Sequence, residues 1–134
     1  MAMAKTLKQK EEYYRKDGNI QFIFEDMQIL NDFDLHLLCK KFKSINSYLL
    51  SDDKILDSGK FKYFDRVLPD LIAANNRVLI FSQFVMMLDI IEEYLKIRNI
   101  RFCRLDGQTK VTDRMGIIDN FYEDKEIKVF NLII

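Results

Sequence analysis

The chain has 134 residues, enough for one domain with a hydrophobic core, and its 49% hydrophobic content excludes a disordered protein. Its 21 Lys and Arg residues balance 21 Asp and Glu residues, so a uniformly basic nucleic-acid surface is excluded, although a local basic face is not. Cys39 and Cys103 match no metal-binding spacing, and no apolar run approaches the roughly 18 residues of a membrane span. We therefore expect an intracellular, reduced protein with no membrane partner.

The first 57 residues are expected to form a helical lead-in to a following domain. Residues 1–18 are highly charged and poor in large aliphatic side chains, which predicts a helical or frayed start. Asn31 is the expected N-cap of a helix of about 10 residues, with Asp34 favourably placed in its first turn.

From residue 58 onward, helical spacing of apolar residues alternates with short continuous apolar runs. Asp57 or Ser58 is expected to cap the first helix, and Pro69 predicts a kink or break inside it because an interior proline costs about 3 kcal/mol. The run at 78–81 has the large apolar side chains of a parallel strand that is buried on both faces. Helices are expected near 58–76, 84–96 and 109–122, and strands at 78–81, 100–105 and 127–134.

This order predicts an α/β architecture. Strands joined by helices of ten or more residues are parallel, with right-handed crossovers, and ligands of such sheets sit beyond the carboxyl ends of the strands. Two polar segments fall there: Ser82-Gln83 after the first predicted strand, and residues 106–109, Asp-Gly-Gln-Thr, after the second.

Both segments suit phosphate binding, and each also has a plainer interpretation. Ser82 adds a hydroxyl donor to the free N–H groups of a helix start, or it simply caps that helix. Gly107 lets the backbone approach a ligand closely or adopt a positive φ. Thr109 either donates to a phosphate or caps the following helix, whose apolar stripe is Val111, Met115, Ile118 and Tyr122. The alternative for the whole segment is an ordinary turn between a strand and a helix. The phosphate interpretation gains weight if the two strands are neighbours.

Charged residues gather around the second segment. Arg104, Lys110 and Arg114 are candidates for neutralising backbone phosphates, against the alternative of a solvated charged face. Arg114 lies one turn into a helix, where a cation is unfavourable, and this placement indicates a ligand or a partner carboxylate. The acidic pair Glu92-Glu93 is expected on a solvent face.

Several of these motifs occur in the order and spacing of a known family. RVLIFSQF (77–84) is similar to motif IV, and RLDGQT (104–109) with the downstream DR (113–114) to motif IVa, of the C-terminal helicase lobe of SNF2-type ATPases. The stretches at 23–50 and 55–61 are similar to the segment that enters this lobe in the branch with DEAD/H box and CUE domains. The resemblance covers about residues 20–130.

The resemblance implies a partial RecA-like lobe at 58–134, with flanking helices on a parallel sheet, that grips one DNA strand by its phosphates. The complete enzyme would be an ATP-dependent DNA translocase that remodels nucleosomes in the nucleus, with DNA, the nucleosome and the N-terminal lobe of the same ATPase as partners. The motif match carries over these DNA-contacting positions: Ser82, Gln83, Arg104, Asp106, Gly107, Thr109 and Arg114.

Departures from the family pattern limit the expected activity. The family continues with a motif V of the type STKAGG and a motif VI whose arginine meets ATP, whereas here the third strand reads VFNLII, with Asn131 in a usually apolar position. The Walker A lysine and the DEAD/H acidic residues of the first lobe are also missing. Phosphoryl transfer needs the phosphate cradle, the metal and usually an arginine together. We therefore expect no catalytic residue, metal site or cofactor in this chain and no ATPase activity from it alone; ATP and Mg²⁺ belong to the complete parent enzyme.

Three functional hypotheses follow. The chain is an inactive, DNA-contacting part of a chromatin remodeller, a protein-interaction module that uses its charged N-terminal helices, or an independent α/β protein such as a phospho-receiver-like domain. The third is disfavoured because a receiver needs an acidic pocket where the first strand here ends in Ser-Gln. The third strand, ending in LII, is expected to be an unpaired edge that promotes self-association.

Overall fold

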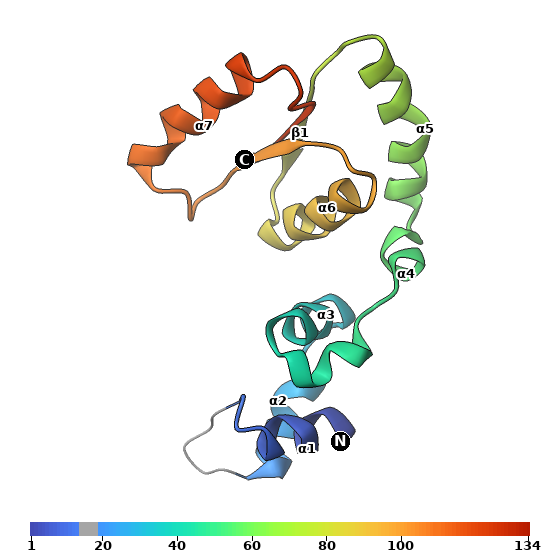
Figure 1. The fold of residues 1–134 in the computed structure, drawn as a ribbon, viewed down its shortest axis with the longest axis vertical. Coiled ribbons are helices and arrows are strands. Elements are labelled where there is room, and N and C mark those ends of the chain that lie inside the picture. The colour runs from blue at the N-terminus through green and yellow to red at the C-terminus, as the bar shows by residue number, and fades with distance from the viewer. Residues whose placement is uncertain (14–18) are drawn as a thin grey trace. The chain divides into compact units, whose positions relative to one another are not determined.

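The structure is a computed structural model that describes residues 1–13 and 19–134, and it divides the chain into two compact units, Met1–Ser51 and Asp52–Ile134 (Figure 1). The end of the predicted charged lead-in, residues 14–18, lies outside the described residues.

The first unit is helical and has a core of its own. It contains α1 (Ala2–Gln9), α2 (Ile20–Gln28), α3 (Asp32–Lys41) and the 3-10 helix η1 (Lys43–Tyr48). The cap of α3 is the predicted one, because Oδ1 of Asn31 accepts a hydrogen bond from the Asp34 N–H at 2.9 Å. Small and medium-sized apolar side chains form the core: Ala4, Leu7, Ile23, Met27, Cys39 and Ile45.

The second unit has the predicted alternation of helices and strands. After the short helix α4 (Asp52–Leu56) come α5 (Gly59–Ala73), β1 (Val78–Ser82), α6 (Val85–Ile97), β2 (Phe102–Leu105), α7 (Val111–Glu123) and β3 (Val129–Ile133). The three strands form one parallel sheet in the order β1-β3-β2. Figure 1 shows α6 and α7 on opposite sides of this sheet.

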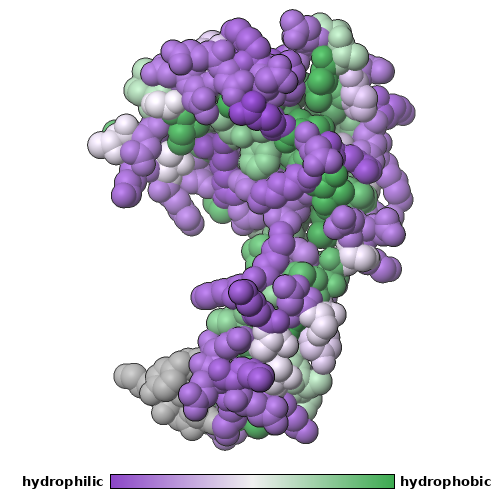
Figure 2. Space-filling model, in the orientation of Figure 1, coloured by the Kyte–Doolittle hydropathy of each residue, from purple (hydrophilic) through white to green (hydrophobic). Residues whose placement is uncertain are grey.

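The register of the sheet divides its side chains between these two helices. Ile80, Asn131 and Arg104 are aligned across the three strands and therefore share one face, which is the face of α6 because Arg104 bonds to residues of that helix. Cys103 and Phe130 share the other face and pack with Phe121 of α7. Polar side chains cover most of the face of this unit that Figure 2 shows, with apolar side chains visible between them.

The α6 layer is held by aromatic and aliphatic packing. Ser58 caps α5 as predicted, since its Oγ accepts the Phe61 N–H at 3.2 Å. The Phe61 ring stacks on the Tyr94 ring of α6 with centroids 4.7 Å apart, and both side chains are buried. Leu88, Ile91 and Leu95 complete the buried side of α6. Ser58 thereby fixes the start of the helix that brings Phe61 to this core.

The predicted position of β3 at an edge of the sheet is wrong. β3 is the central strand and pairs with β1 on one side and β2 on the other. The open edges belong to β1 and β2, and the prediction failed because strand order depends on long-range crossovers, whereas the pattern VFNLII shows only that the strand is apolar. Self-association remains a prediction, but the edge that could support it is β1 or β2.

Two apolar patterns predicted to be buried are partly exposed. Leu79 and Phe81 of β1 are 51% and 55% exposed, so this strand is not covered on both faces. On α7, Val111, Met115 and Tyr122 are also exposed. α7 packs on β2 and through Phe121 on Phe130 of β3, and the face of β1 beside it stays open.

The predicted break at Pro69 does not occur, because α5 continues through it to Ala73. Pro69 is on the exposed side of the helix, between the buried Leu68 and the exposed Asp70. Phe61 and Leu68 are buried before the proline, and Leu71 and Ile72 are half-buried after it, so packing on both sides of Pro69 overrides the local preference.

Candidate nucleic-acid interface

The candidate site lies at the carboxyl edge of the parallel sheet. The loop at 82–84 follows β1, and the loop at 106–110 follows β2. The phosphate interpretation would have gained weight if β1 and β2 were neighbours. They are not neighbours, because β3 lies between them. With neighbouring strands about 4.8 Å apart, the two loops begin about 10 Å from each other. The two loops lie at the same edge of the sheet, but the strands that they follow do not pair with each other.

Ser82 folds the first loop back on itself. Its Oγ accepts the Phe84 N–H at 3.0 Å and donates to the Phe84 carbonyl at 3.1 Å. Phe84, not Ser82, is the N-cap residue of α6, and it makes no side-chain cap. The hydroxyl of Ser82 is thus engaged within the loop and does not cap α6.

Gln83 and Phe84 are exposed beside this helix start. Together with Val85, Met86, Met87 and Ile90 they line an open, mostly apolar cleft. The phenyl ring of Phe84 is 71% exposed, and the sequence marks this position only as the start of the helix expected at 84–96.

Asp106 organises the second loop. Its Oδ1 accepts the Gln108 N–H at 2.9 Å, and its own N–H donates to Oγ1 of Thr109 at 3.1 Å. The Thr109 N–H donates to the Asp106 carbonyl at 3.2 Å. Thr109 is therefore used inside the loop, and the prediction that it caps α7 is wrong: Lys110 is the N-cap residue, with no side-chain cap. Helices α6 and α7 therefore both begin at N-cap residues that make no side-chain cap.

Arg104 is surrounded by carboxylates. Its Nη1 lies 2.5 Å from Oδ1 of Asp89 and 2.8 Å from Oε1 of Glu92, both on α6. Its Nε and Nη2 both reach Oδ2 of Asp106 at 2.7 Å. The guanidinium joins α6 to the second loop, and three carboxylates against one cation give this cluster a net charge of −2.

The cluster shifts the pKa of both key members. Burial alone would lower the pKa of Arg104, but its hydrogen bonds to Glu92, Asp89 and Asp106 outweigh burial and raise it. Burial alone would raise the pKa of Asp106, but hydrogen bonds from Arg104 and the Gln108 N–H lower it overall. Both groups are charged throughout the physiological pH range, so the link between α6 and the loop is permanently ionic.

The prediction that the acidic pair Glu92-Glu93 of α6 faces solvent is wrong. Glu93 is buried and pairs with Lys96 at 3.2 Å, and Glu92 divides its carboxylate between Lys96 and Arg104. Asp89 and Glu92 are the members of the site that sequence reasoning missed. The available signal was an arginine in an apolar strand, FCRL, which needs a buried partner, and two acids one helical turn apart on the preceding helix.

Lys110 and Arg114 are the predicted cations at the start of α7. Lys110 is exposed, and Arg114 donates from Nε to the Thr109 carbonyl at 3.2 Å. Within residues 1–13 and 19–134, no carboxylate forms an ion pair with Arg114. Gly107 is exposed, its φ is not positive, and a Cβ there would meet no atom within 4 Å, so the fold itself does not require glycine.

The residues present do not fit a nucleotide–metal site. The sequence contains no G-x-x-x-x-G-K-[ST] loop, and across the described part of the chain no three His, Cys, Asp or Glu residues gather as metal ligands. No helix among these residues is long and apolar enough to span a membrane. We derive no nucleotide chemistry from this chain.

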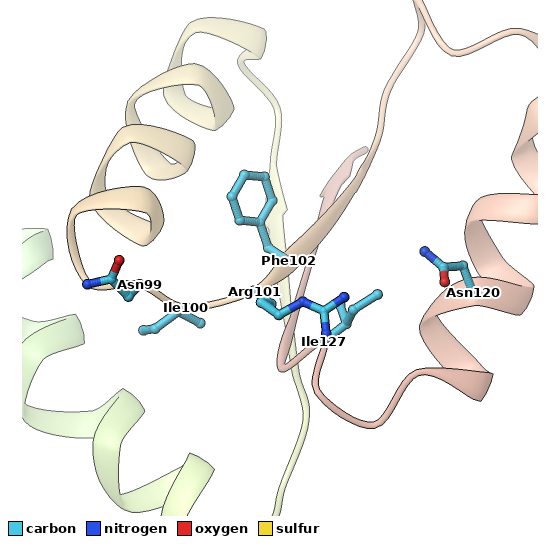
Figure 3. Close-up of a pocket in the computed structure, with 6 residues that line it drawn as sticks. All are labelled: Asn99, Ile100, Arg101, Phe102, Asn120 and Ile127. Atoms are coloured by element: carbon cyan, nitrogen blue, oxygen red, sulfur yellow. The ribbon is translucent and has the colours of Figure 1, made fainter.

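A second open cleft lies at the opposite, amino edge of the sheet (Figure 3). Arg101 and Phe102 line it from the start of β2, and Asn120 projects toward them from α7. Arg101 is already paired there with Asp124 at 2.6 Å. This cleft provides a surface with a cation of its own, at the other edge of the sheet from the candidate interface.

A parallel sheet with helices on both faces, and with the candidate loops at its carboxyl edge, defines a lobe of the doubly wound α/β class. The chain belongs to the family of the helicase conserved C-terminal domain, whose model matches residues 59–132. The predicted resemblance to the C-terminal lobe of SNF2-type ATPases is confirmed by relatives and solved structures.

Two relatives illustrate the match. ATP-dependent helicase fft2 of Schizosaccharomyces pombe is 45% identical over 97% of this chain and 10% of the relative. The mouse SWI/SNF-related matrix-associated actin-dependent regulator of chromatin subfamily A containing DEAD/H box 1 is 49% identical over 87% of this chain and 11% of the relative. The chain therefore spans about a tenth of the length of these curated relatives.

Solved structures confirm the RecA-like fold. The C-terminal part of the Fun30 ATPase domain aligns with a TM-score of 0.91 and 39% identity, over 98% of this chain and 43% of that one. The C-terminal domain of the Sulfolobus solfataricus SWI2/SNF2 ATPase, at 18% identity and a TM-score of 0.56, covers 83% of this chain and 53% of that one, and shows the same fold.

Proposed function

We propose that this chain contributes DNA-backbone contacts to an ATP-dependent chromatin remodeller of the nucleus, through the carboxyl edge of its sheet. The observation that carries this proposal is that α6 and α7 both begin at this edge of the sheet, from N-cap residues that make no side-chain cap, with Lys110 and Arg114 beside the start of α7. Backbone N–H groups and cations bind phosphate without reading base sequence, which is what a translocase that acts on any DNA needs.

The proposal assigns distinct parts to the site residues. The backbone around Gln83 and Gly107 approaches the phosphates, and Lys110 and Arg114 neutralise them. Ser82, Asp106 and Thr109 are used to shape the loops, because their side chains already have partners there. ATP and Mg²⁺ are bound by other parts of the complete enzyme, including its N-terminal lobe, and this chain alone hydrolyses no ATP.

The test is duplex DNA binding measured by fluorescence anisotropy over a range of salt concentrations. Each phosphate contact contributes about 0.9 to the slope of log affinity against log salt. The double variant Lys110→Gln/Arg114→Gln should bind more weakly, with a slope reduced by about 1.8. Arg101→Gln, at the amino edge, removes one positive charge away from the candidate interface and should leave the slope unchanged.

Binding that is absent, or equally sensitive to salt in the double variant, would refute the phosphate contacts. The second candidate function, a protein-interaction module, would then be preferred. The exposed apolar side chains of α7, Val111, Met115 and Tyr122, favour that alternative, because an apolar stripe on a helix surface is suited to a protein partner.

A further inference from the structure

Each nitrogen of Arg104 already contacts a carboxylate, and these contacts use four of the five N–H donors of the guanidinium. Its Nε, Nη1 and Nη2 are all within 2.8 Å of carboxylate oxygens, and its side chain is 20% exposed. A phosphate that approached the remaining N–H of Nη2 would meet a cluster with net charge −2, which repels anions. The position of Arg104 in a DNA-contacting motif therefore needs an explanation other than direct contact.

The hydrogen bonds continue from Arg104 into the second loop. Asp106, held by Arg104, accepts the Gln108 N–H and also lies 3.4 Å from Oγ1 of Thr109. The Thr109 carbonyl in turn accepts the Nε–H of Arg114. One continuous path thus leads from α6, through Arg104 and Asp106, to the cation that the proposed function places on the DNA.

The geometry points to Arg104 as a positioning residue, which fixes the loop at 106–109 against α6 and thereby presents Gly107 and Arg114 to the DNA backbone. This inference rests on the proposed function. An ordered loop binds more tightly because it does not lose conformational freedom on binding. Arg104 acts through Asp106 and touches no DNA itself.

The fork of the guanidinium is essential to this role. Arg104 reaches three carboxylates on two elements at once, from a planar group with fixed donor directions. A lysine at this position keeps the charge and is a good phosphate ligand, but its single ammonium cannot hold all three carboxylates in the same geometry. Arg104→Lys therefore separates positioning from phosphate contact at constant charge.

The experiment measures two properties of the whole chain. Without DNA, amide hydrogen exchange of Gln108 should be faster in Arg104→Lys, while the amides of Phe130 and Leu132 in β3 remain protected. With duplex DNA, Arg104→Lys should bind about tenfold more weakly, as an added ordering cost of about 1.4 kcal/mol requires, with an unchanged salt slope. Arg101→Lys, the same change in the Asp124 ion pair, should alter neither property.

Opposite results would overturn the inference. If Arg104→Lys keeps both the slow exchange of Gln108 and the affinity of the unmodified chain, Arg104 does not position the loop. If the amides of β3 also lose protection in Arg104→Lys, the milder variant Glu92→Gln, which removes one of the three carboxylates, is measured in its place. Unchanged exchange of the Gln108 amide in Glu92→Gln then refutes the inference. If the unmodified chain binds no DNA, the proposed function fails, whereas the exchange measurement still decides whether Arg104 orders the loop.

Discussion

Replacing Asn131 by leucine should stabilise the second unit. Asn131 is fully buried in the central strand β3, and neither its Nδ2 nor its Oδ1 has a hydrogen-bond partner among the described residues. Its neighbours across the sheet are Ile80 and Arg104. A buried amide without partners loses its hydration and gains nothing in return, so the fold carries this cost at its centre.

The magnitude follows from three contributions. Removing the unpartnered amide of Asn131 recovers about 1–3 kcal/mol. The leucine side chain gains the free energy of apolar burial, about 1.5–3 kcal/mol when complete. Its slightly different shape costs about 1–3 kcal/mol if the core is already well packed. We expect a net increase of about 2 kcal/mol in the free energy of unfolding.

The assay is urea unfolding of Asn131→Leu, followed by the amide signals of β3 so that the second unit is observed by itself. Asn131→Ala is the control, because it removes the same amide but leaves a cavity, and it should be less stable than the leucine variant by about 2–3 kcal/mol. A leucine variant that is less stable than the unmodified chain would refute the reasoning, since it would show that the amide is well satisfied.

Three further predictions concern the same unit. Burial, and then the hydrogen bond to Asp65, raise the pKa of Tyr94 to about 12. The stability that its neutral hydroxyl contributes is therefore complete below about pH 10 and is lost as the pH rises through about 12. A pH titration followed by tyrosinate absorbance should show one late step, and Tyr94→Phe should remove that step. Pro69→Ala should raise the free energy of unfolding by about 1–2 kcal/mol in urea, because the exposed proline interrupts the hydrogen bonds of α5; a loss of stability would show that Pro69 packs favourably. The chain should self-associate through the open edge of β1, where Leu79 and Phe81 are exposed, and Phe81→Lys should reduce the association in sedimentation experiments; a strictly monomeric unmodified chain would contradict this.

Features set by neighbouring residues were predicted well. The caps at Asn31 and Ser58 occur where expected, because a side chain that accepts an N–H two or three residues later depends on local sequence alone. The alternation of helices and strands was also predictable from apolar spacing. The family motifs then located the carboxyl edge of the sheet.

Features that depend on distant residues were not predictable in this way. The central position of β3 results from how the crossovers place the strands. The partners of Arg104 lie 12 and 15 residues away on α6, and only the folded chain shows that Asp89 and Glu92 face β2. Thr109 could equally cap a helix or close a turn, and the choice was decided by Asp106, whose carboxylate Arg104 holds in place.

The central claim is that DNA lies against the carboxyl edge of the sheet, and backbone amide NMR during a titration with duplex DNA tests it most directly. The two ends of the sheet serve as each other's control. We predict shifts concentrated at Gln83, Gly107 and Lys110, with little change at Asn99 and Arg101 beside the amino-edge cleft (Figure 3). Shifts concentrated at Asn99 and Arg101, or none at the carboxyl edge, would contradict the proposed interface.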